Sequence, residues 1–389
     1  MKEIKLIRTS TVADSINILL KGQPGFLNNF FEVITVSSPS ELLNEVKDRE
    51  GVRVISVPME RKINPYKDIV SLWRLYITFC KEKPTIVHSI TPKAGLLSML
   101  AAKMAGVPIR IHTFTGLIFP SRTGFLKILL IFMDKLLCWA ATNIYPEGNG
   151  VKNDLINYKI TYKPLKVIAN GNVNGIDLDY FSSVNISNAN KSSLRNELNL
   201  AEDDFTFIFV GRLVGDKGIN ELVEAFSKLK IQKVKLLLVG PFETDLDPLQ
   251  PDILKEIEIN PNILSVGFQK DVRPFFAISD ALIFPSYREG FPNVVIQAGA
   301  MELPSIVSNI NGCNEIIING KNGIIVPSKN VEEIYKAMQK MISDNNSYET
   351  FKYHARAMIK SRYEQKVVWN ALLNEYNRLL IEKGINPAG

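Results

Sequence analysis

The sequence predicts an α/β protein with two doubly wound parallel sheets, each in its own domain. Short apolar runs alternate with helical patterns along the chain, and this alternation is typical of units that build a parallel sheet. The chain has 389 residues, more than one hydrophobic core normally supports, so about two domains are expected. Hydrophobic residues make up 46% of the chain and charged residues 22%, as in an ordinary globular protein.

The first half of the chain predicts a complete doubly wound sheet. Apolar runs predict strands at residues 4–8, 31–36, 52–57, 85–89, 109–113 and 142–145. Helical patterns lie between them at residues 14–29, 39–50, 65–81, 93–105 and 123–141. Ligands bind beyond the carboxyl ends of the strands in such sheets, so the loops there are the candidate sites.

The segment 125–141 is apolar around most of its circumference, with only Lys127, Asp134 and Lys135 interrupting it. It is too short and too charged for a membrane-spanning helix, which needs about 20 apolar residues. One interpretation is a buried core helix. The other is an interfacial helix that docks on an anionic membrane through Arg122, Lys127 and Lys135.

Charge is distributed unevenly along the chain. Residues 1–165 contain 22 Lys and Arg against 13 Asp and Glu, whereas the rest contains 24 against 27. The basic half is expected to face an anionic partner, either a membrane surface or a pyrophosphate-bearing ligand, unless this is ordinary variation in surface charge. Nucleic acid is not expected, because its binders more often show clustered basic runs with stacking aromatics.

Cysteine usage and the start of the chain predict a cytoplasmic protein. Cys80, Cys138 and Cys313 are odd in number and far apart, so they suggest no disulfide framework and no metal pattern. The first ten residues carry charges through what would be the apolar region of a signal peptide. A reducing compartment is therefore expected.

A domain junction is predicted within residues 163–185, where closely spaced Asn and Gly precede a Ser/Asn-rich stretch. The alternation then restarts, with strands predicted at residues 205–210, 235–239, 263–266, 281–284, 305–308 and 323–326. Amphipathic helices are expected at residues 331–343, 348–363 and 364–383. The second half thus predicts a second doubly wound sheet.

The loop after the strand at 205–210 predicts an anion site. Gly211, Gly215 and Gly218 allow tight turns there, and Arg212 and Lys217 lie in the same strand-to-helix loop. Two cations at a helix start are unfavourable for the helix dipole, and an anion would relieve that cost. Solvated surface charge is the alternative interpretation.

Residues 281–300 combine a carboxylate with a helix start. A strand of four apolar residues breaks at Pro285, Glu289 follows, and Pro292 is predicted to open a helix. The free backbone N–H groups of residues 293–295 would then face the carboxyl edge of the sheet and favour a phosphate. A sugar bearing a diphosphate fits both features, with Glu289 accepting from its hydroxyls. The alternative is a surface turn before a core helix.

The sequence EGFPNVVIQAGA, residues 289–300, resembles the E-x7-E element of retaining, nucleotide-sugar-dependent glycosyltransferases. The resemblance is to family 4 of the GT-B type, especially members in bacterial capsule and exopolysaccharide assembly. It implies that Glu289 contacts the donor sugar and that the second position holds the ribose. This chain departs from the pattern with Gln297, whose amide can still bond to a ribose diol but without charge assistance.

The same resemblance implies further donor-binding residues. Arg212 and Lys217 would neutralise the diphosphate, Gly211 would bind the donor in the same loop, and the base would lie at Gly267 and Phe268. The resemblance also assigns Phe291, Asn293 and Val294 to the donor side.

Family resemblance continues across residues 89–116 and implies a catalytic role for His112, at the donor sugar or the acceptor region. A structural histidine bonded to a nearby backbone group is the alternative. The sequence NGCNEII, residues 311–317, matches the capsular subgroup without an assigned role.

The resemblance implies two facing doubly wound domains: an acceptor-binding domain at 1–170, a nucleotide-sugar-binding domain at 171–365, and a helix at 366–389 crossing back to the first. The predicted function is transfer of a sugar from a nucleotide-diphosphate donor to a saccharide acceptor on polyprenyl pyrophosphate, with retention of the anomeric configuration. The expected nucleotide is UDP. The protein is expected in the cytoplasm or at the inner face of the membrane. An epimerase of the same fold and a catalytically silent nucleotide-sugar-binding protein remain alternatives, the latter favoured by Gln297.

Two D-x-D triplets, residues 177–179 and 245–247, are the kind that holds a divalent cation in glycosyltransferases of the other main fold. Neither directly follows a strand facing the Arg212 loop. We therefore expect no metal, and no cofactor beyond the nucleotide sugar as substrate.

Overall fold

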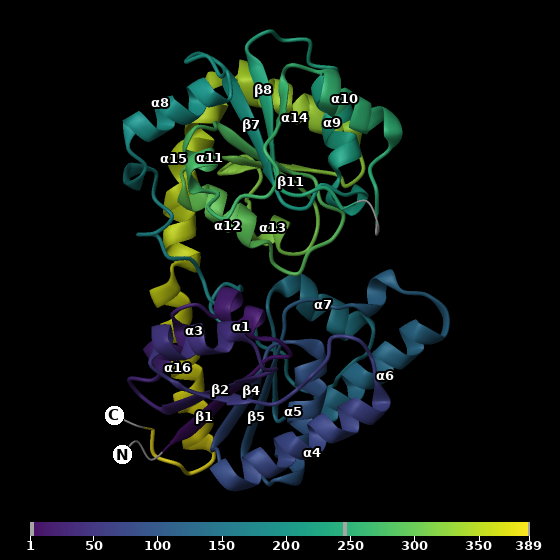
Figure 1. Cartoon of the computed structure of the whole chain (residues 1–389), viewed down its shortest axis with the longest axis vertical. Helices are drawn as coiled ribbons and strands as arrows, with labels where there is room; N and C mark the ends of the chain where they lie inside the picture. The colour runs from purple at the N-terminus through teal and green to yellow at the C-terminus, as the bar shows by residue number, and fades with distance from the viewer. Residues whose placement is uncertain (1–3, 244–246, 388–389) are drawn as a thin grey trace. The chain divides into compact units, whose positions relative to one another are not determined.

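The computed structural model describes residues 4–243 and 247–387. The chain divides into two compact units: unit 1 comprises Met1–Gly175 and Gln365–Gly389, and unit 2 comprises Ile176–Glu364. Each unit contains a six-stranded sheet of parallel strands, in the orders β3-β2-β1-β4-β5-β6 and β12-β11-β10-β7-β8-β9 (Figure 1). The predicted fold class of two doubly wound sheets is thereby confirmed.

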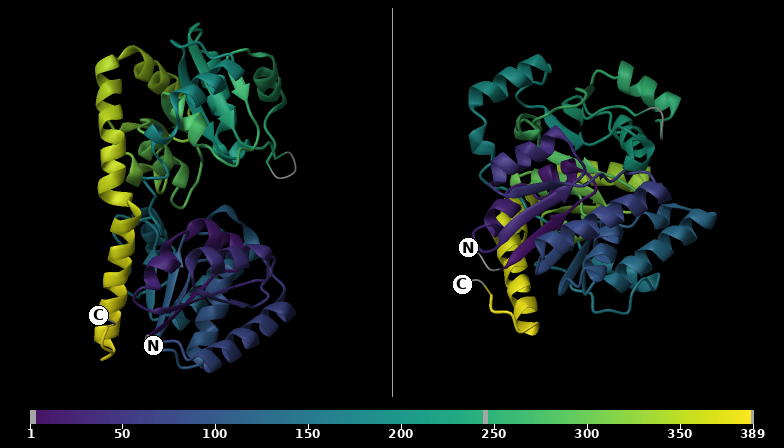
Figure 2. Two further views of the ribbon diagram at one scale, coloured as in Figure 1. Left: turned by 60° about the vertical axis from the view of Figure 1, so that its left-hand side comes forward. Right: turned by 60° about the horizontal axis from the view of Figure 1, so that its bottom comes forward.

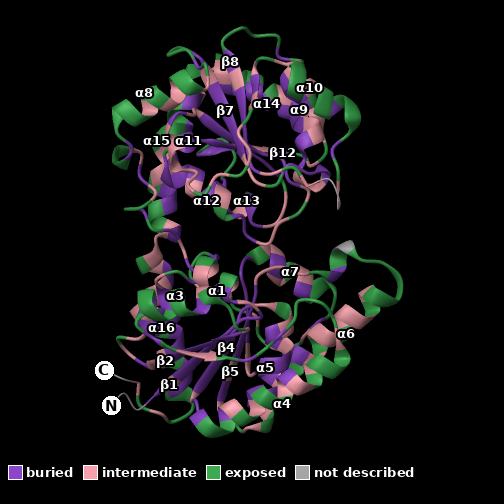
Figure 3. Ribbon diagram, in the orientation of Figure 1, coloured by how far each residue is buried: buried purple, intermediate pink, exposed green. Residues whose placement is uncertain are grey.

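The strands of unit 1 lie within one or two residues of their predicted positions. They are β1 (Lys5–Thr9), β2 (Glu32–Ser37), β3 (Arg53–Ser56), β4 (Ile86–Ser89), β5 (Ile109–Phe114) and β6 (Asn143–Pro146). The α-helices are α1 (Ala13–Leu19), α2 (Gln23–Leu27), α3 (Glu41–Glu50), α4 (Pro65–Glu82), α5 (Pro92–Met104), α6 (Gly124–Ala140) and α7 (Asn149–Asn157). The central strands are buried on both faces, which explains their nearly continuous apolar runs (Figure 3).

The single helix predicted at residues 14–29 is wrong. The chain forms α1 and α2 instead, because Gly22 takes a left-handed conformation with φ of +83° at the N-cap of α2. A side chain there would also clash, since a Cβ on Gly22 would lie 2.7 Å from the ring of Trp369. Helix α7 was not predicted.

In unit 2, β7 (Phe205–Val210), β10 (Ala281–Phe284), β11 (Ser305–Ser308) and β12 (Gly323–Val326) match the predicted bounds, and β8 (Val234–Val239) and β9 (Ile263–Ser265) differ by one residue. The helices are α8 (Asn188–Glu197), α9 (Ile219–Ser227), α10 (Pro251–Ile259), α11 (Arg273–Ala277), α12 (Asn293–Ala300), α13 (Cys313–Ile316), α14 (Val331–Ser343) and α15 (Asn345–Tyr363). The Ser/Asn-rich stretch that follows the predicted junction forms helix α8, which was not predicted. It buries none of its residues, so it lacks the apolar periodicity that would have revealed it.

The last helix, α16 (Gln365–Glu382), packs against the sheet of unit 1 (Figure 2). Its apolar face joins residues of β1, β2, β4 and β5 in one core cluster, and Leu372, Tyr376 and Leu380 are buried there. Residues separated by more than 360 positions therefore share one hydrophobic core. Unit 1 is completed only by the end of the chain.

A buried polar network ties α16 to this sheet. The guanidinium of Arg8, 2% exposed, donates to Gln23 Oε1 at 2.8 Å and to the hydroxyl of Tyr376 at 2.9 Å. The same hydroxyl lies 2.6 Å from His88 Nδ1, and His88 Nε2 lies 2.8 Å from Thr113 Oγ1. Burial, with the nearby charge of Arg8 and then His112, lowers the pKa of His88 well below its ordinary value, so the ring is neutral. Tyr376 thus accepts from Arg8 and donates to His88.

We predict that Tyr376→Phe destabilises unit 1 by about 1–3 kcal/mol, because Arg8 and His88 each lose a buried hydrogen-bond partner. Urea unfolding followed by circular dichroism measures the change. Tyr353→Phe is the matched control, since Tyr353 is 79% exposed and its change should cost under about 0.5 kcal/mol. Equal stability of the two variants would contradict the role given to the Tyr376 hydroxyl.

Candidate active site

The loop after β7 approaches the loop after β10 closely enough to exclude any side chain at Gly218. Residues Gly215–Lys217 form a 3-10 turn, Gly218 takes φ of +72°, and α9 begins at the next residue. A Cβ on Gly218 would lie 2.2 Å from the carbonyl oxygen of Pro285. The glycine therefore lets Lys217 reach the residues that follow β10.

Lys217 and Glu289 form an ion pair at the carboxyl edge of the unit 2 sheet. Their side chains are 16% and 17% exposed, so the pair is partly screened from water. Ser286, fully buried, donates from its hydroxyl to the same Glu289 oxygen, Oε1, at 2.9 Å. Oε2 of Glu289 has no hydrogen-bond partner among the described residues. One carboxylate oxygen is held by the protein, and the other can accept a hydrogen bond from a ligand hydroxyl.

Further hydrogen bonds fix the two loops against each other. The backbone N–H of Tyr287 donates to the carbonyl of Asp216 at 2.9 Å, and the Tyr287 hydroxyl donates to Glu221 Oε1 at 2.6 Å. Arg288 pairs with Asp216 at 3.3 Å. Asp247 accepts from the backbone N–H of Asp216. These contacts hold the Lys217–Glu289 pair on a rigid frame.

Arg212 and Lys217 do not crowd a helix start as uncompensated cations, and that prediction is corrected. Both precede α9, and each has a carboxylate partner within unit 2. Arg212 pairs with Glu243 at 2.6 Å, with side chains 46% and 34% exposed. An exposed pair of this kind contributes little stability and can exchange partners.

The start of α12 also differs from the prediction. Pro292 is the N-cap, with an extended backbone, instead of the first helical residue. The backbone N–H of Val295 donates to the carbonyl of Pro292 at 3.2 Å, so it does not face outward as predicted. The backbone groups of Asn293 and Val294 remain candidates for contact with a phosphate.

The other predicted donor-side residues occupy different environments. Phe291 is 7% exposed and its ring centroid lies 5.6 Å from that of Tyr363, so it packs in the core. Phe268 is 73% exposed, next to Gly267, whose carbonyl accepts from the N–H of Gly240 at 2.8 Å. The side-chain amide of Gln297 is partly exposed and has no hydrogen-bond partner among the described residues. A ligand can therefore reach Phe268 and Gln297 more readily than Phe291.

Helix α13 begins beside Glu289, which gives a location to the NGCNEII sequence. A Cβ on Gly312 would lie 2.7 Å from the carbonyl oxygen of Gly290, so the two backbones touch. Burial raises the pKa of the Cys313 thiol, and the charge of Glu289 raises it further while Lys217 lowers it. Cys313 is therefore a neutral neighbour of the ion pair. The sequence held no signal for the contact of Gly312 with Gly290, because it depends on the packing of separate loops. The hydrogen bond of Ser286 to Glu289 is local, within one loop, and depends on the fold of that loop.

His112 lies in the interior of unit 1. It is 1% exposed, its Nδ1 lies 2.8 Å from Ser89 Oγ, and its ring packs edge-on against Phe114 at 4.6 Å. A Cβ on Gly95 would lie 2.4 Å from its Cε1 atom. This packing favours the structural alternative over direct catalytic contact, although the partner is a serine hydroxyl instead of the expected backbone group.

Asp177 and Asp247 of the two D-x-D triplets accept hydrogen bonds from the backbone. Asp177 accepts through Oδ1 from the backbone N–H groups of Asp179 and Tyr180, at 3.0 and 2.9 Å, and so closes a turn. Asp245 and Leu246 lie outside the described residues. Across residues 4–243 and 247–387, no group of three or more His, Cys, Asp and Glu side chains could hold a metal ion.

We predict that acid destabilises unit 1 through His112. Burial lowers the pKa of His112 to about 3, whereas an unfolded histidine titrates near 6.5. Between these values the unfolded state binds more protons, so the free energy of unfolding falls as the pH falls. The loss attributable to His112 is about 2 kcal/mol at pH 5.

Urea unfolding of His112→Asn at pH 7.5 and pH 5 tests this, because the variant lacks the titrating ring and should show a smaller pH difference. The control is His354→Asn, because His354 is a partly exposed residue of unit 2. This variant should show the same difference in unfolding free energy between the two pH values as the wild type. An unchanged pH difference in His112→Asn would contradict the assignment.

Comparison with known proteins agrees with this architecture. The profile of the glycosyl transferases group 1 matches residues 190–358, and that of glycosyltransferase family 4 matches residues 28–179. The capsular polysaccharide biosynthesis glycosyltransferase CapM of Staphylococcus aureus is 35% identical, over 98% of this chain and 99% of its own. The UDP-Gal:alpha-D-GlcNAc-diphosphoundecaprenol alpha-1,3-galactosyltransferase of Escherichia coli is 29% identical, over 82% of this chain and 81% of its own.

Two solved structures share the fold. A glycosyltransferase of Rickettsia africae superimposes with a TM-score of 0.81 at 21% identity, over 98% of this chain and 99% of its own. Anabaena HepE, solved with UDP and glucose, has a TM-score of 0.79 at 16% identity, over 97% and 100%. The two doubly wound units are those of a glycosyltransferase with the GT-B fold. The chain belongs to glycosyltransferase family 4, among the members of the bacterial capsular and exopolysaccharide type.

Proposed function

We propose that this protein transfers a sugar from a UDP-linked donor to a sugar on a polyprenyl diphosphate, during synthesis of a capsular or related polysaccharide. The Staphylococcus aureus relative is named for capsule synthesis, and the Escherichia coli relative for a UDP donor and a diphosphoundecaprenol-linked acceptor. The observation that carries the proposal is the Lys217–Glu289 pair on its rigid frame, because it joins a cation for a diphosphate to a carboxylate for a sugar.

Each residue has a distinct role in the proposed donor site. Lys217 and Arg212 bind the diphosphate, and Arg212 exchanges the exposed Glu243 for it. Glu289 accepts from donor-sugar hydroxyls through Oε2, while Ser286 and Lys217 fix its other oxygen. Phe268 stacks on the base, and the amide of Gln297 bonds to the ribose.

The proposed reaction breaks the bond between the anomeric carbon and the diphosphate oxygen as an acceptor hydroxyl oxygen bonds to that carbon. The hydroxyl proton passes to the departing diphosphate. Lys217 and Arg212 lower the barrier, because negative charge grows on the diphosphate as the bond breaks. Attack from the face that the diphosphate leaves retains the anomeric configuration, a feature taken from the family resemblance. We propose that these side chains neutralise the diphosphate without a metal.

We predict that Glu289→Ala and Lys217→Ala each lower kcat at least 10²-fold, the order of effect expected when a preorganised charge is removed from a developing one. Transfer is measured by product mass, with UDP-glucose, UDP-galactose and UDP-N-acetylglucosamine as donors, a GlcNAc-diphospholipid as acceptor, and with and without EDTA. The double variant Glu224→Ala/Lys228→Ala removes a largely exposed Lys–Glu pair at the C-terminal end of α9 and should retain activity.

Several outcomes contradict the proposal. If the donor sugar is epimerised in the absence of acceptor, the protein is an epimerase. If it binds a UDP-sugar but turns over none of the donor and acceptor combinations, it is a catalytically silent binding protein. An inverted anomeric centre in the product rejects retention, and loss of activity with EDTA rejects the metal-free site.

The second part of the proposal is that unit 1 docks on the cytoplasmic face of an anionic membrane. Helix α6 presents an exposed stripe at helical spacing, Phe125, Ile128, Phe132 and Trp139, so it is not the fully buried core helix of the other interpretation. Helix α4 presents a second exposed stripe, formed by Tyr66, Ile69, Trp73 and Ile77. Helix α5 lies between α4 and α6 and packs against both (Figure 1). None of the helices described here has the length and apolar character needed to cross a bilayer.

Basic side chains accompany these stripes, which favours an anionic surface over a neutral one. Arg74 and Lys135 are exposed on α4 and α6, and Lys103 lies 3.1 Å from the ring centroid of Trp139. Apolar side chains inserted at the headgroup level and flanking cations are the two terms that hold an interfacial helix.

We predict that the full chain co-sediments with vesicles containing anionic phospholipid but not with neutral ones. Phe125→Ser/Phe132→Ser should reduce the bound fraction severalfold, because two large apolar side chains no longer insert. Ile259→Ser/Tyr353→Ser changes two similarly exposed apolar residues of unit 2 and should bind as the wild type does. Equal loss in both double variants would contradict docking through α6.

A further inference from the structure

Unit 1 contains a cavity of about 360 Å³ beyond the carboxyl ends of its central strands. Its floor is formed by Thr11 and Thr91, whose hydroxyls lie 2.8 Å apart after β1 and β4, and by Phe114 at the end of β5. This is the sheet edge at which doubly wound folds bind ligands. The volume falls in the range of small-molecule sites.

The walls of the cavity are mostly apolar. Leu96 of α5 and Leu130 and Met133 of α6 form one side, and Ile63 and Ile118 lie at the opening. The last two are 47% and 45% exposed. Such a lining favours a ligand with apolar groups or faces, and polar groups that enter need specific partners.

One carboxyl group stands in this apolar lining. Asp134 of α6 faces the cavity, and no residue within the described ranges pairs with it or hydrogen-bonds to it. Burial raises the pKa of Asp134 to about 7, so near neutral pH the group can both donate and accept hydrogen bonds. Asp134 is half-buried. A carboxyl that is partly withdrawn from water without a partner is costly to the fold, and such groups concentrate at ligand sites.

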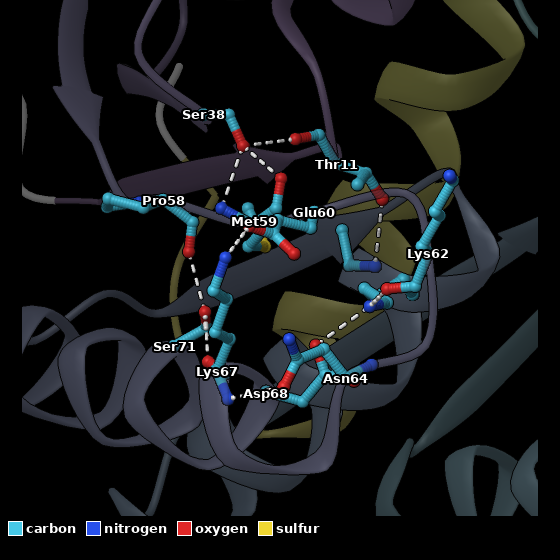
Figure 4. Close-up of polar contacts among 12 residues, drawn as sticks. Thr11, Ser38, Pro58, Met59, Glu60, Lys62, Asn64, Lys67, Asp68 and Ser71 are labelled. Atoms are coloured by element: carbon cyan, nitrogen blue, oxygen red, sulfur yellow. Dashed lines mark hydrogen bonds and ion pairs between the residues drawn. The ribbon is translucent and has the colours of Figure 1, made fainter.

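The segment that carries Arg61 at the opening of the cavity is held in place by hydrogen bonds. Figure 4 shows residues flanking Arg61 and Ile63 tied to their neighbours: Ser38 Oγ accepts from the Met59 N–H at 2.8 Å, and Ser71 Oγ donates to the Pro58 carbonyl at 2.6 Å. Lys93, which also lines the cavity, pairs with Asp68 at 2.8 Å and donates to the carbonyl of Lys62.

Arg61 itself is exposed and has no ion-pair partner among the described residues. It therefore offers an uncommitted positive charge at the opening, on a segment already fixed in place. An anionic group bound there would sit beside the apolar cavity.

We propose that this cavity binds the sugar diphosphate end of the acceptor, and that this sugar carries an acetamido group. The diphosphate lies at Arg61, and the amide N–H or a hydroxyl bonds to Asp134. The acetyl methyl group packs against Leu130 and Met133. This rests on the proposed function for the class of acceptor. A hydrocarbon chain in the cavity would explain the apolar walls but would leave Asp134 without a partner. A plain hexose would fill less of the apolar wall than an acetamido sugar.

Binding without donor tests this independently of transfer. Calorimetric titration of the full chain uses three probes: GlcNAc-diphospho-farnesol, glucose-diphospho-farnesol and farnesyl diphosphate. We expect the first to bind at least 10-fold more tightly than the other two. Asp134→Leu should weaken binding of the first probe on the order of 10- to 100-fold and abolish its preference over the second, as for loss of a buried hydrogen bond to a carboxyl group.

Arg61 is exposed, so Arg61→Ala carries little risk to folding, and it should weaken the binding of all three probes by a similar factor. Lys47→Ala, at an exposed position of α3, should not weaken the binding of any probe. UDP binding should be unchanged in every variant, which verifies the fold. Farnesyl diphosphate binding as tightly as the GlcNAc probe would overturn the inference in favour of a lipid chain. Unaltered probe preference in Asp134→Leu, or unaltered affinity in Arg61→Ala, would overturn it as well. None of these binding results depends on whether the enzyme turns over.

Discussion

The ion pair between Lys217 and Glu289 is the contact on which the candidate active site depends. It exists because the loops after β7 and β10 approach within the distance that only a glycine at position 218 permits. Ser286 then fixes one oxygen of the carboxylate and leaves the other available. A cation and a carboxylate therefore lie side by side at one edge of the sheet, and the proposed donor site is built on this pair.

The two units use their buried polar groups differently. In unit 2 the charged groups lie at the edge of the sheet and are partly exposed, where a ligand can replace a protein partner. In unit 1 the network of Arg8, His88 and Tyr376 is sealed inside the core, and its hydrogen bonds stabilise the packing of α16. Asp134 belongs to neither pattern, because it faces a cavity and none of the described residues pairs with it. That contrast is the reason for assigning it to a ligand.

Much of the fold could be predicted because local sequence determines it. Strands β7 and β10 are continuous apolar runs, and their bounds match the prediction to the residue. The errors occurred where local patterns were weak or misleading: Gly22 divides a predicted helix, and α8 lacks buried residues. The family was also predictable, since residues 289–300 carry its pattern in one uninterrupted stretch apart from Gln297.

The sequence by itself determined the two parallel sheets, the family and the identity of Glu289 and Lys217 as candidates, because these follow from periodicity and short motifs. Only the tertiary structure decided which groups meet. It buried His112 against Ser89, gave Arg212 a carboxylate partner, and left Asp134 facing a cavity. The hydrogen bonds and the desolvation of a side chain depend on residues that are distant in the chain. Those residues become neighbours only when the helices, strands and loops pack together.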